Sequence, residues 1–221
     1  MNKRNLFRGV LAAVAAVTLC TGQTASAKQP ENLNKMLSGD FRITGTGACL
    51  SVGAPSTFDP DTLVPQIDPL GISPTVRSDS SWGVIRFNGD GTGRREYRTV
   101  SVIHPNKAGF NGSGSSAVAV VEFTYQVEAD WSFSMQTTSF TGTVLRGIRK
   151  DQMFTVSSSP PSQLVGQISK DGEVISFTQL EPTVQTQTYP NDPNGTIFNR
   201  ICHGSWTGIK KQAINGRDLN D

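Results

Sequence analysis

The sequence predicts an all-β protein: a single antiparallel β-barrel, closed or nearly closed, of about eight or more strands. Three observations predict this fold. Apolar and polar residues alternate with a period of two in several segments. Gly, Pro, Asn and Asp clusters separate those segments at short intervals. The two cysteines after residue 27 fall in the first and last strand candidates. A β-sandwich is the alternative layout.

Residues 1–27 have the features of a secretory signal peptide that is cleaved after Ala27. Three basic residues precede an apolar run from Val10 to Leu19, and Ala25-Ser26-Ala27 provides small residues for cleavage. No later segment approaches the ~20 apolar residues that a membrane-spanning helix needs, so we expect no transmembrane segment. The prediction is an exported protein, periplasmic or extracellular.

The charge of the mature chain is close to neutral. The full chain of 221 residues has 20 basic and 18 acidic residues, and removal of the three basic residues of the signal leaves 17 against 18, a formal net charge of −1. This balance does not favour nucleic acid or an anionic membrane as a partner. We expect a single domain over residues 28–209 and a flexible C-terminal tail over residues 210–221.

The first elements after the signal are a short helical candidate, a strand and a long connection. Helical signal is confined to Glu31–Leu37, and the first strand candidate is Asp40–Val52. Residues 52–81 contain five prolines, which argues against a central strand. We expect this segment to be a long Pro-rich loop, either a lid or an ordered surface loop.

The stretch "RFNGDGTGRREY", Arg86 to Tyr97, imitates the start of a calcium loop. Its twelfth position would be Thr99 instead of a bidentate acid, and its flanks have the pattern of strands, not helices. A glycine-rich β-turn is therefore favoured. Two registers stay open: one opposes Tyr97 to Ile85 and the other opposes Tyr97 to Val84.

Two hairpins follow from apolar alternation. In "AVAVVEFTYQVEADWSFSM" a turn centred on Asp130 would oppose Val127 to Phe133, which keeps one apolar face. In "VGQISKDGEVISF" the pair Asp171-Gly172 predicts a two-residue type I′ turn that opposes Ile168 to Ile175. Further strand candidates are Phe140–Ile148, Gln152–Ser158, Phe177–Thr188 and Thr196–Ile209.

Cys49 and Cys202 are expected to form a disulfide, because a lone pair in an oxidising compartment is usually bridged. A bridge requires their Cα atoms to lie within about 7 Å. The first and last strands would then be neighbours. Closing a meandering sheet into a barrel produces this adjacency, which favours the barrel over the sandwich.

The runs "SGDFRITGTGACLSV", "WGVIRFNGDGTG" and "CHGSWTG" resemble the layout of small exported bacterial proteins of unassigned activity. At the level of architecture the chain is similar to the lipocalin/calycin group of β-barrels. The lipocalin G-x-W motif lies on the first strand, whereas Gly204-Ser205-Trp206 lies on the last strand candidate here. No ligand residue of that group is therefore transferred to this chain.

The sequence contains none of the common catalytic motifs. There is no G-x-S-x-G elbow, H-E-x-x-H, P-loop, or dinucleotide fingerprint in its strand-to-helix context. We assign no catalytic residue, metal ligand or cofactor. His104 and His203 have the setting of ordinary surface or strand histidines, and Glu122 and Glu128 that of solvated carboxylates. In "RREYR", alternation predicts that Arg94, Glu96 and Arg98 share one solvated face.

Three functional classes remain. A closed barrel could hold a small apolar or amphipathic ligand in a cavity of about 300 Å³ or more. The aromatic residues available to line it are Trp82, Tyr125, Trp131, Phe133 and Trp206. If these residues simply fill the interior, a structural or interaction protein of the bacterial cell envelope is favoured. An enzyme such as a cyclase or isomerase would need an inward polar group.

Overall fold

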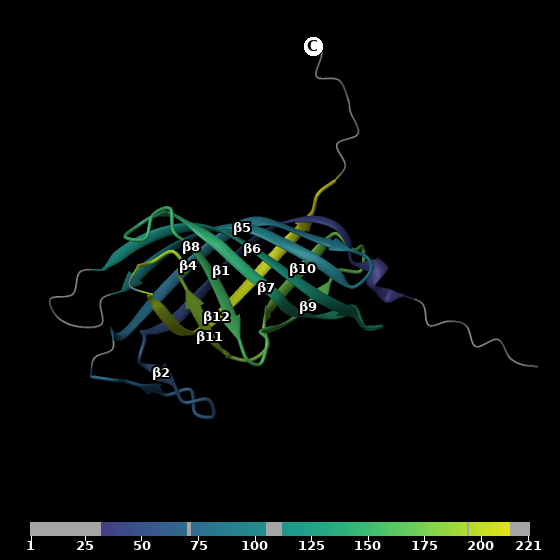
Figure 1. Ribbon diagram of the computed structural model, residues 1–221. Coiled ribbons are helices and arrows are strands. Elements are labelled where there is room, and N and C mark those ends of the chain that lie inside the picture. The colour runs from purple at the N-terminus through teal and green to yellow at the C-terminus, as the bar shows by residue number, and fades with distance from the viewer. Residues whose placement is uncertain (1–31, 70–71, 105–111, 194, 213–221) are drawn as a thin grey trace, which may run out of the picture. The chain divides into compact units, whose positions relative to one another are not determined.

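The computed structural model of the protein describes residues 32–69, 72–104, 112–193 and 195–212 (Figure 1). The predicted signal peptide lies outside these residues, and so does most of the predicted tail. Within the described residues, no helix is long and apolar enough to cross a membrane.

The described residues contain one short 3-10 helix and twelve strands. They are η1 (Leu33–Met36), β1 (Ser38–Gly53), β2 (Thr57–Phe58), β3 (Pro65–Gln66), β4 (Ile72–Asn88), β5 (Thr92–His104), β6 (Ser113–Val127), β7 (Ser132–Arg146), β8 (Met153–Ser158), β9 (Gln163–Ile168), β10 (Val174–Gln179), β11 (Val184–Thr188) and β12 (Ile197–Lys210). Apart from the hairpin of β2 and β3, all strands belong to one antiparallel sheet. The predicted all-β fold with at least eight strands is confirmed.

The sheet closes on itself. Strands β1, β4, β5, β6 and β7 pair in that order, and β1 also pairs with β12. Strand β7 pairs with β9 along its first residues and with β8 further on. On one route β9 pairs with β10, and β10 pairs with β12. On the other route β8 pairs with β11, and β11 pairs with β12. Either route completes a ring of eight strands that encloses a common interior.

The predicted disulfide joins the two strands that close the ring. Cys49 of β1 and Cys202 of β12 are register partners with their Cα atoms 4.1 Å apart, and their sulfur atoms are bonded. The pairing of β1 with β12 extends from Phe41–Lys210 to Gly53–Phe198. The expected adjacency of first and last strands is therefore confirmed.

Two apolar clusters occupy the interior. The larger one contains Leu37, Phe41, Ile43, Ile85, Phe87, Phe123, Tyr125, Val127, Phe133, Met135, Leu164, Ile168, Ile175 and Phe177. Helix η1 packs Leu33 and Met36 against this cluster, and the Tyr125 hydroxyl donates to the Leu37 carbonyl at 2.8 Å. The smaller cluster contains Ala117, Val144, Phe154 and Tyr189. Polar residues line the interior next to both clusters.

Interior aromatic rings lie across from glycines on the neighbouring strand. The register pairs are Gly45–Trp206, Gly83–Tyr97, Gly93–Phe123, Gly142–Phe154 and Gly166–Phe133. A Cβ atom added to any of these glycines would lie less than 3 Å from its aromatic partner. Each ring thus occupies the space that the glycine leaves free, which fixes how the rings pack inside the ring of strands.

Both predicted hairpin registers are confirmed, although one turn differs. Val127 lies opposite Phe133, and Ile168 lies opposite Ile175. The connection after Ile168 is wider than a two-residue type I′ turn, because the Ser169 amide donates to the Val174 carbonyl. Asp171 also lacks the positive φ that type I′ requires, whereas Gly172 has a φ of 72°. The predicted turn type is therefore wrong.

The register of β4 with β5 differs from both predicted alternatives. Tyr97 lies opposite Gly83, not Val84 or Ile85. The turn centres on Asp90, whose carboxylate accepts the Thr92 amide at 2.8 Å. The reason is steric, because a Cβ atom at position 83 would lie 2.0 Å from the Glu96 carbonyl oxygen and 2.5 Å from Cα of Tyr97, so only glycine fits there. In this register Arg95 lies opposite Ile85 and faces the interior.

The predicted loop over residues 52–81 is too long by a third. Residues 72–81 belong to β4, a strand inside the ring that pairs with both β1 and β5. Pro74 is tolerated because the pairing of β4 with β5 begins only at Val76, and the register with β1 shifts between Ser51 and Gly53. The remainder of the segment includes the small hairpin of β2 and β3.

Two of the other strand candidates have different bounds. The predicted strand Phe140–Ile148 is the second half of β7, which runs without a break from Ser132. The predicted strand Phe177–Thr188 is divided at Pro182 into the end of β10 and β11. The final strand β12 continues to Lys210, the first residue of the predicted tail.

Loss of the disulfide should destabilise the fold strongly. The bridge spans 153 residues, and in the chain-entropy model a loop of that length is worth roughly 5 kcal/mol. We expect the variant Cys49→Ser with Cys202→Ser to lose up to that free energy of unfolding in urea. The matched control is Ala48→Ser with His203→Ser, an adjacent register pair whose residues are exposed. Equal stability of the two double variants would contradict the prediction.

The glycine–aromatic packing predicts a clear difference between two glycines. A Cβ at position 142 would lie 2.4 Å from the Phe154 ring, whereas one at position 114 meets nothing closer than 3.6 Å. We expect Gly142→Ala to lower the free energy of unfolding by about 1–3 kcal/mol through overpacking. Gly114→Ala should change it by less than about 0.5 kcal/mol. Denaturant titration of both variants checks this, and an unchanged Gly142→Ala would show that the ring can move aside.

Candidate functional site

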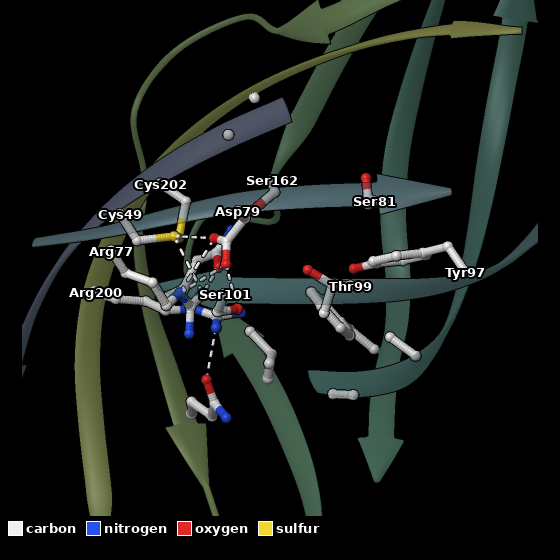
Figure 2. Close-up of a pocket in the computed structure, with 18 of the residues that line it drawn as sticks. Cys49, Arg77, Asp79, Ser81, Tyr97, Thr99, Ser101, Ser162, Arg200 and Cys202 are labelled. Atoms are coloured by element: carbon white, nitrogen blue, oxygen red, sulfur yellow. Dashed lines mark hydrogen bonds and ion pairs between the residues drawn. A yellow bond between two sulfur atoms is a disulfide. The ribbon is translucent and has the colours of Figure 1, made fainter. Parts of the chain in front are cut away.

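A cavity of about 160 Å³ lies inside the ring, bordered by members of both apolar clusters. Its lining comes from strands on every side of the ring, including β1, β4, β5, β6, β11 and β12. Figure 2 shows the disulfide and several charged side chains gathered on one wall. Most of the buried polar side chains of the described residues line this cavity.

Strand alternation places the polar residues on this wall. Along β4 the inward positions are Arg77, Asp79 and Ser81, followed beyond Gly83 by the buried Ile85 and Phe87. The inner face of that strand therefore changes from charged to apolar. Strand β5 pairs with β4 and also directs polar side chains inward, namely Arg95, Tyr97, Thr99 and Ser101.

Asp79 is held by two neighbours. The Arg77 guanidinium Nε lies 3.0 Å from Asp79 Oδ1, and the Ser101 hydroxyl donates to the same oxygen at 2.5 Å. A second nitrogen of Arg77 contacts the Cys49 sulfur at 3.3 Å. The carboxylate of Asp79 is thus neutralised by Arg77 (Figure 2).

Arg200 is buried among neutral acceptors. It is 5% exposed, and its Nε and Nη1 donate to the side-chain oxygens of Gln185 at 3.0 Å and Gln187 at 2.6 Å. Gln187 donates in turn to the Tyr189 hydroxyl at 2.6 Å. Burial lowers the pKa of Arg200 to about 10, and the nearby charge of Arg77 acts in the same direction.

Arg95 is buried with an unsatisfied donor. It is 7% exposed, and its Nε has no hydrogen-bond partner among the described residues. Its guanidinium carbon lies 4.7 Å from the Trp206 ring centroid and 4.8 Å from that of Tyr97. Burial lowers the pKa of Arg95, and the Tyr97 phenol partly opposes this effect. Cation–π contacts stabilise the charge but do not satisfy the Nε–H group.

The cavity has an excess of positive charge. Three guanidinium groups and one carboxylate line it, and that carboxylate is paired with Arg77. No ion pair joins Arg95 or Arg200 to a carboxylate in the part of the chain that the structure describes. Buried charges are normally paired, because removing them from water is unfavourable. The side chains that line the cavity therefore carry a net positive charge.

Of the five aromatic residues predicted to line a cavity, only Trp206 does so. It stacks on Phe177, contacts Arg95 and donates from Nε1 to the Ser81 hydroxyl at 3.0 Å. Tyr125 and Phe133 belong to the large apolar cluster, and Trp131 packs against that cluster from its turn. Trp82 is 46% exposed. Its neighbours on β4, Ser81 and Gly83, take the inward positions, so alternation turns Trp82 outward.

The residues that dominate the cavity were not predicted, although one clue was present. Arg94 and Glu96 form the expected exposed ion pair at 2.8 Å, and Arg98 is exposed on the same face. The same alternation requires Arg95 and Tyr97 to face inward. A similar inference applies to "QTQTY", in which Gln185, Gln187 and Tyr189 share one face.

His104 and the predicted solvated carboxylates do not border the cavity, whereas His203 does so at its edge. His104 is exposed and contacts the Ser78 hydroxyl at 2.9 Å, and His203 is exposed as well. Glu122 and Glu128 are exposed, as expected. Within the described ranges, no cluster of three or more His, Cys, Asp or Glu residues has metal-binding geometry.

Comparisons with known proteins give no functional assignment. No family model and no curated protein matches the chain. Among solved structures, the Salmonella SPI-1 type III secretion injectisome secretin InvG is similar over 82% of this chain at 7% identity and a TM-score of 0.25. The chain spans 61% of the length of that secretin chain. The enduracididine biosynthesis enzyme MppR is similar over 91% of this chain and 96% of its own, at 8% identity and a TM-score of 0.20. These values are too low to support an argument, and the lipocalin-like layout stays a prediction.

Burial of Arg95 should lower the stability of the protein without ligand. We expect Arg95→Met, which keeps an unbranched chain and removes the charge, to raise the free energy of unfolding by about 1 kcal/mol or more. The control Arg94→Met changes an exposed neighbour and should stay within about 0.5 kcal/mol. Urea unfolding of both variants checks this. A loss of stability in Arg95→Met would assign Arg95 a structural role instead.

Proposed function

We propose that this protein binds a small amphipathic molecule inside its closed sheet. The observation that carries the proposal is the cavity of about 160 Å³ lined by buried cationic and polar side chains. On this proposal the ring of strands acts as a container, and its function is to bind a molecule without transforming it.

The polar lining favours binding over a purely structural role. A structural barrel is most stable when its interior is apolar and fully packed. Here Arg95 and Arg200 are buried at a site that also leaves a void, and Arg95 keeps an unsatisfied donor. Such groups destabilise the empty fold, which is typical of residues retained for recognition.

The size of the cavity limits the ligand. Its volume is below the ~300 Å³ that typical ligand pockets reach. An engineered cavity of about 150 Å³ binds benzene, so one ring or a short chain is the matching size. Phe140, Phe154 and Leu164 offer apolar contacts, while the arginines and glutamines offer polar ones. An amphipathic ligand fits this lining better than a wholly apolar one.

The enzyme alternative receives less support. It needs an inward acid or base that is free to exchange a proton with a substrate. Asp79 is the carboxylate on the cavity wall, and it already accepts from Arg77 and Ser101. A positioned but occupied carboxylate is better suited to orient Arg77 than to catalyse a reaction.

Export from the cytoplasm is part of the proposal. The disulfide between Cys49 and Cys202 supports it, because such bridges persist in oxidising compartments and are rare in the cytosol. The binding protein would then act in the periplasm or outside the cell.

Filling the cavity should abolish binding. Ala119 is 3% exposed and lines the cavity opposite Tyr97 and Gly142, so Ala119→Leu directs three additional carbon atoms into the void. The control Val118→Leu enlarges the preceding, outward-facing side chain. Native mass spectrometry of protein purified from its source should show a co-purified molecule of low mass in the wild type and in Val118→Leu. We expect that molecule to be absent from Ala119→Leu.

Isothermal titration with single-ring and short-chain probes extends the same test. Benzoate, benzamide, butyrate and butyramide cover charged and neutral molecules of the matching size. Binding of any of them that Ala119→Leu abolishes and Val118→Leu keeps would support the proposal. It would be wrong if no molecule co-purified and none of the four probes bound to the wild-type protein.

A further inference from the structure

Two buried guanidinium groups in the cavity have no carboxylate partner among the described residues. Arg95 and Arg200 are each more than nine-tenths buried and line the same cavity, and neither has a carboxylate partner within the described residues. The other charged pair on the wall, Arg77 with Asp79, is neutral as a unit. The uncompensated charge is therefore positive and belongs to Arg95 and Arg200.

The two arginines differ in the donors that they leave open. Arg200 donates from Nε and Nη1 to Gln185 and Gln187, so two of its five N–H donors have a neutral acceptor. Arg95 has the aromatic rings of Tyr97 and Trp206 against its guanidinium, and its buried Nε has no acceptor among the described residues. Arg95 is therefore the less well compensated of the two charges, and an anion would reach it from the side on which the residue borders the cavity.

We propose that the ligand is a small organic acid whose carboxylate pairs with the Arg95 guanidinium where that residue borders the cavity, and balances the positive charge of the cavity. This inference rests on the proposed function, since it names the chemical class of the molecule in the same cavity. The apolar part of the acid lies against the aromatic and aliphatic wall formed by Phe140, Phe154 and Leu164.

A carboxylate matches the site better than a phosphate does. A carboxylate is planar and singly charged, and the guanidinium fork is complementary to it. A phosphate presents three terminal oxygens and up to two charges. Its second charge would have to be balanced by Arg200, which already donates two hydrogen bonds to Gln185 and Gln187. The small volume adds to this preference, because a phosphate ester of any size leaves little room for an apolar group.

Charge complementarity inside the ring gives the acid a large advantage over its neutral amide. Electrostatic interactions are strong where water is excluded, and hydrogen bonds to a charged group are stronger than neutral ones. At pH 7 an amide has the same shape as the corresponding carboxylate but no charge. We therefore expect benzoate to bind the wild-type protein at least tenfold more tightly than benzamide, and butyrate to exceed butyramide similarly.

Isothermal titration at pH 7 with these two probe pairs and with inorganic phosphate tests the inference. Arg95→Met should reduce the preference for acid over amide to less than twofold. The matched control Arg94→Met removes an exposed charge one residue away and should keep the tenfold preference. Circular dichroism confirms that each variant is folded. If Arg95→Met does not fold, Arg95→Gln, which is polar and uncharged, replaces it with the same expected result.

The outcomes separate this inference from the proposed function. Equal affinity of acid and amide for the wild type, with both lost in Ala119→Leu, would overturn the inference and leave the proposed function standing. Tighter binding of phosphate than of either acid would also overturn it. A tenfold preference that survives in the folded Arg95 variant, Arg95→Met or its replacement Arg95→Gln, would remove Arg95 from the site. If no probe binds and nothing co-purifies, the proposed function is wrong and the inference falls with it.

Discussion

The pairing of β1 with β12 is the constraint on which the rest of this structure depends. It joins the first and last strands of the sheet along thirteen register pairs, and the disulfide between Cys49 and Cys202 is one of them. Closure removes the two free edges of the sheet and gives every strand one face without water. A side chain such as Arg95 is buried only because the ring is complete.

Closure also explains why neighbouring residues of the same type have opposite roles. Arg94 and Arg95 are adjacent in sequence and differ only in the face of β5 that they occupy. Arg94 forms an exposed pair with Glu96, where water screens both charges and the contact contributes little to stability. Arg95 enters a cavity whose only carboxylate among the described lining residues is paired with Arg77, and burial there without an ion-pair partner is unfavourable. Because successive side chains of a strand point to opposite faces, Arg95 is buried and Arg94 is exposed.

The sequence was sufficient to predict the fold class, the disulfide and two hairpin registers. The hairpin registers depend on local alternation, as with Val127 opposite Phe133. The disulfide depends on Cys49 and Cys202 being the two cysteines after residue 27. The register of β4 with β5 was predicted wrongly, because both alternatives matched Tyr97 with an apolar residue. The actual partner is Gly83, where the backbone of Glu96 and Tyr97 comes too close for any other side chain. A pattern of apolar residues does not report such close backbone contacts.

The candidate site was missed for a related reason. The residues predicted to line a cavity were all aromatic. Tyr125 and Phe133 do face inward, but they fill the large cluster, and of the five only Trp206 borders the cavity. Once the outward ladder of Arg94, Glu96 and Arg98 was recognised, Arg95 had to face inward. The inward position of Arg95 could therefore be predicted from the sequence. That Arg95 and Arg200 line the same cavity could not be predicted, because it depends on which strands face each other across the ring.

An unliganded protein with buried cations must obtain its stability elsewhere. The two apolar clusters and the disulfide provide it, and none of these requires the cavity to be occupied. The fold therefore does not depend on a counter-charge for Arg95. On the function proposed above, the site would be preorganised for its ligand. A ligand that binds only the folded state stabilises that state by mass action. An anion that pairs with Arg95 would therefore raise the free energy of unfolding of this protein. Affinity and stability are coupled through one guanidinium group.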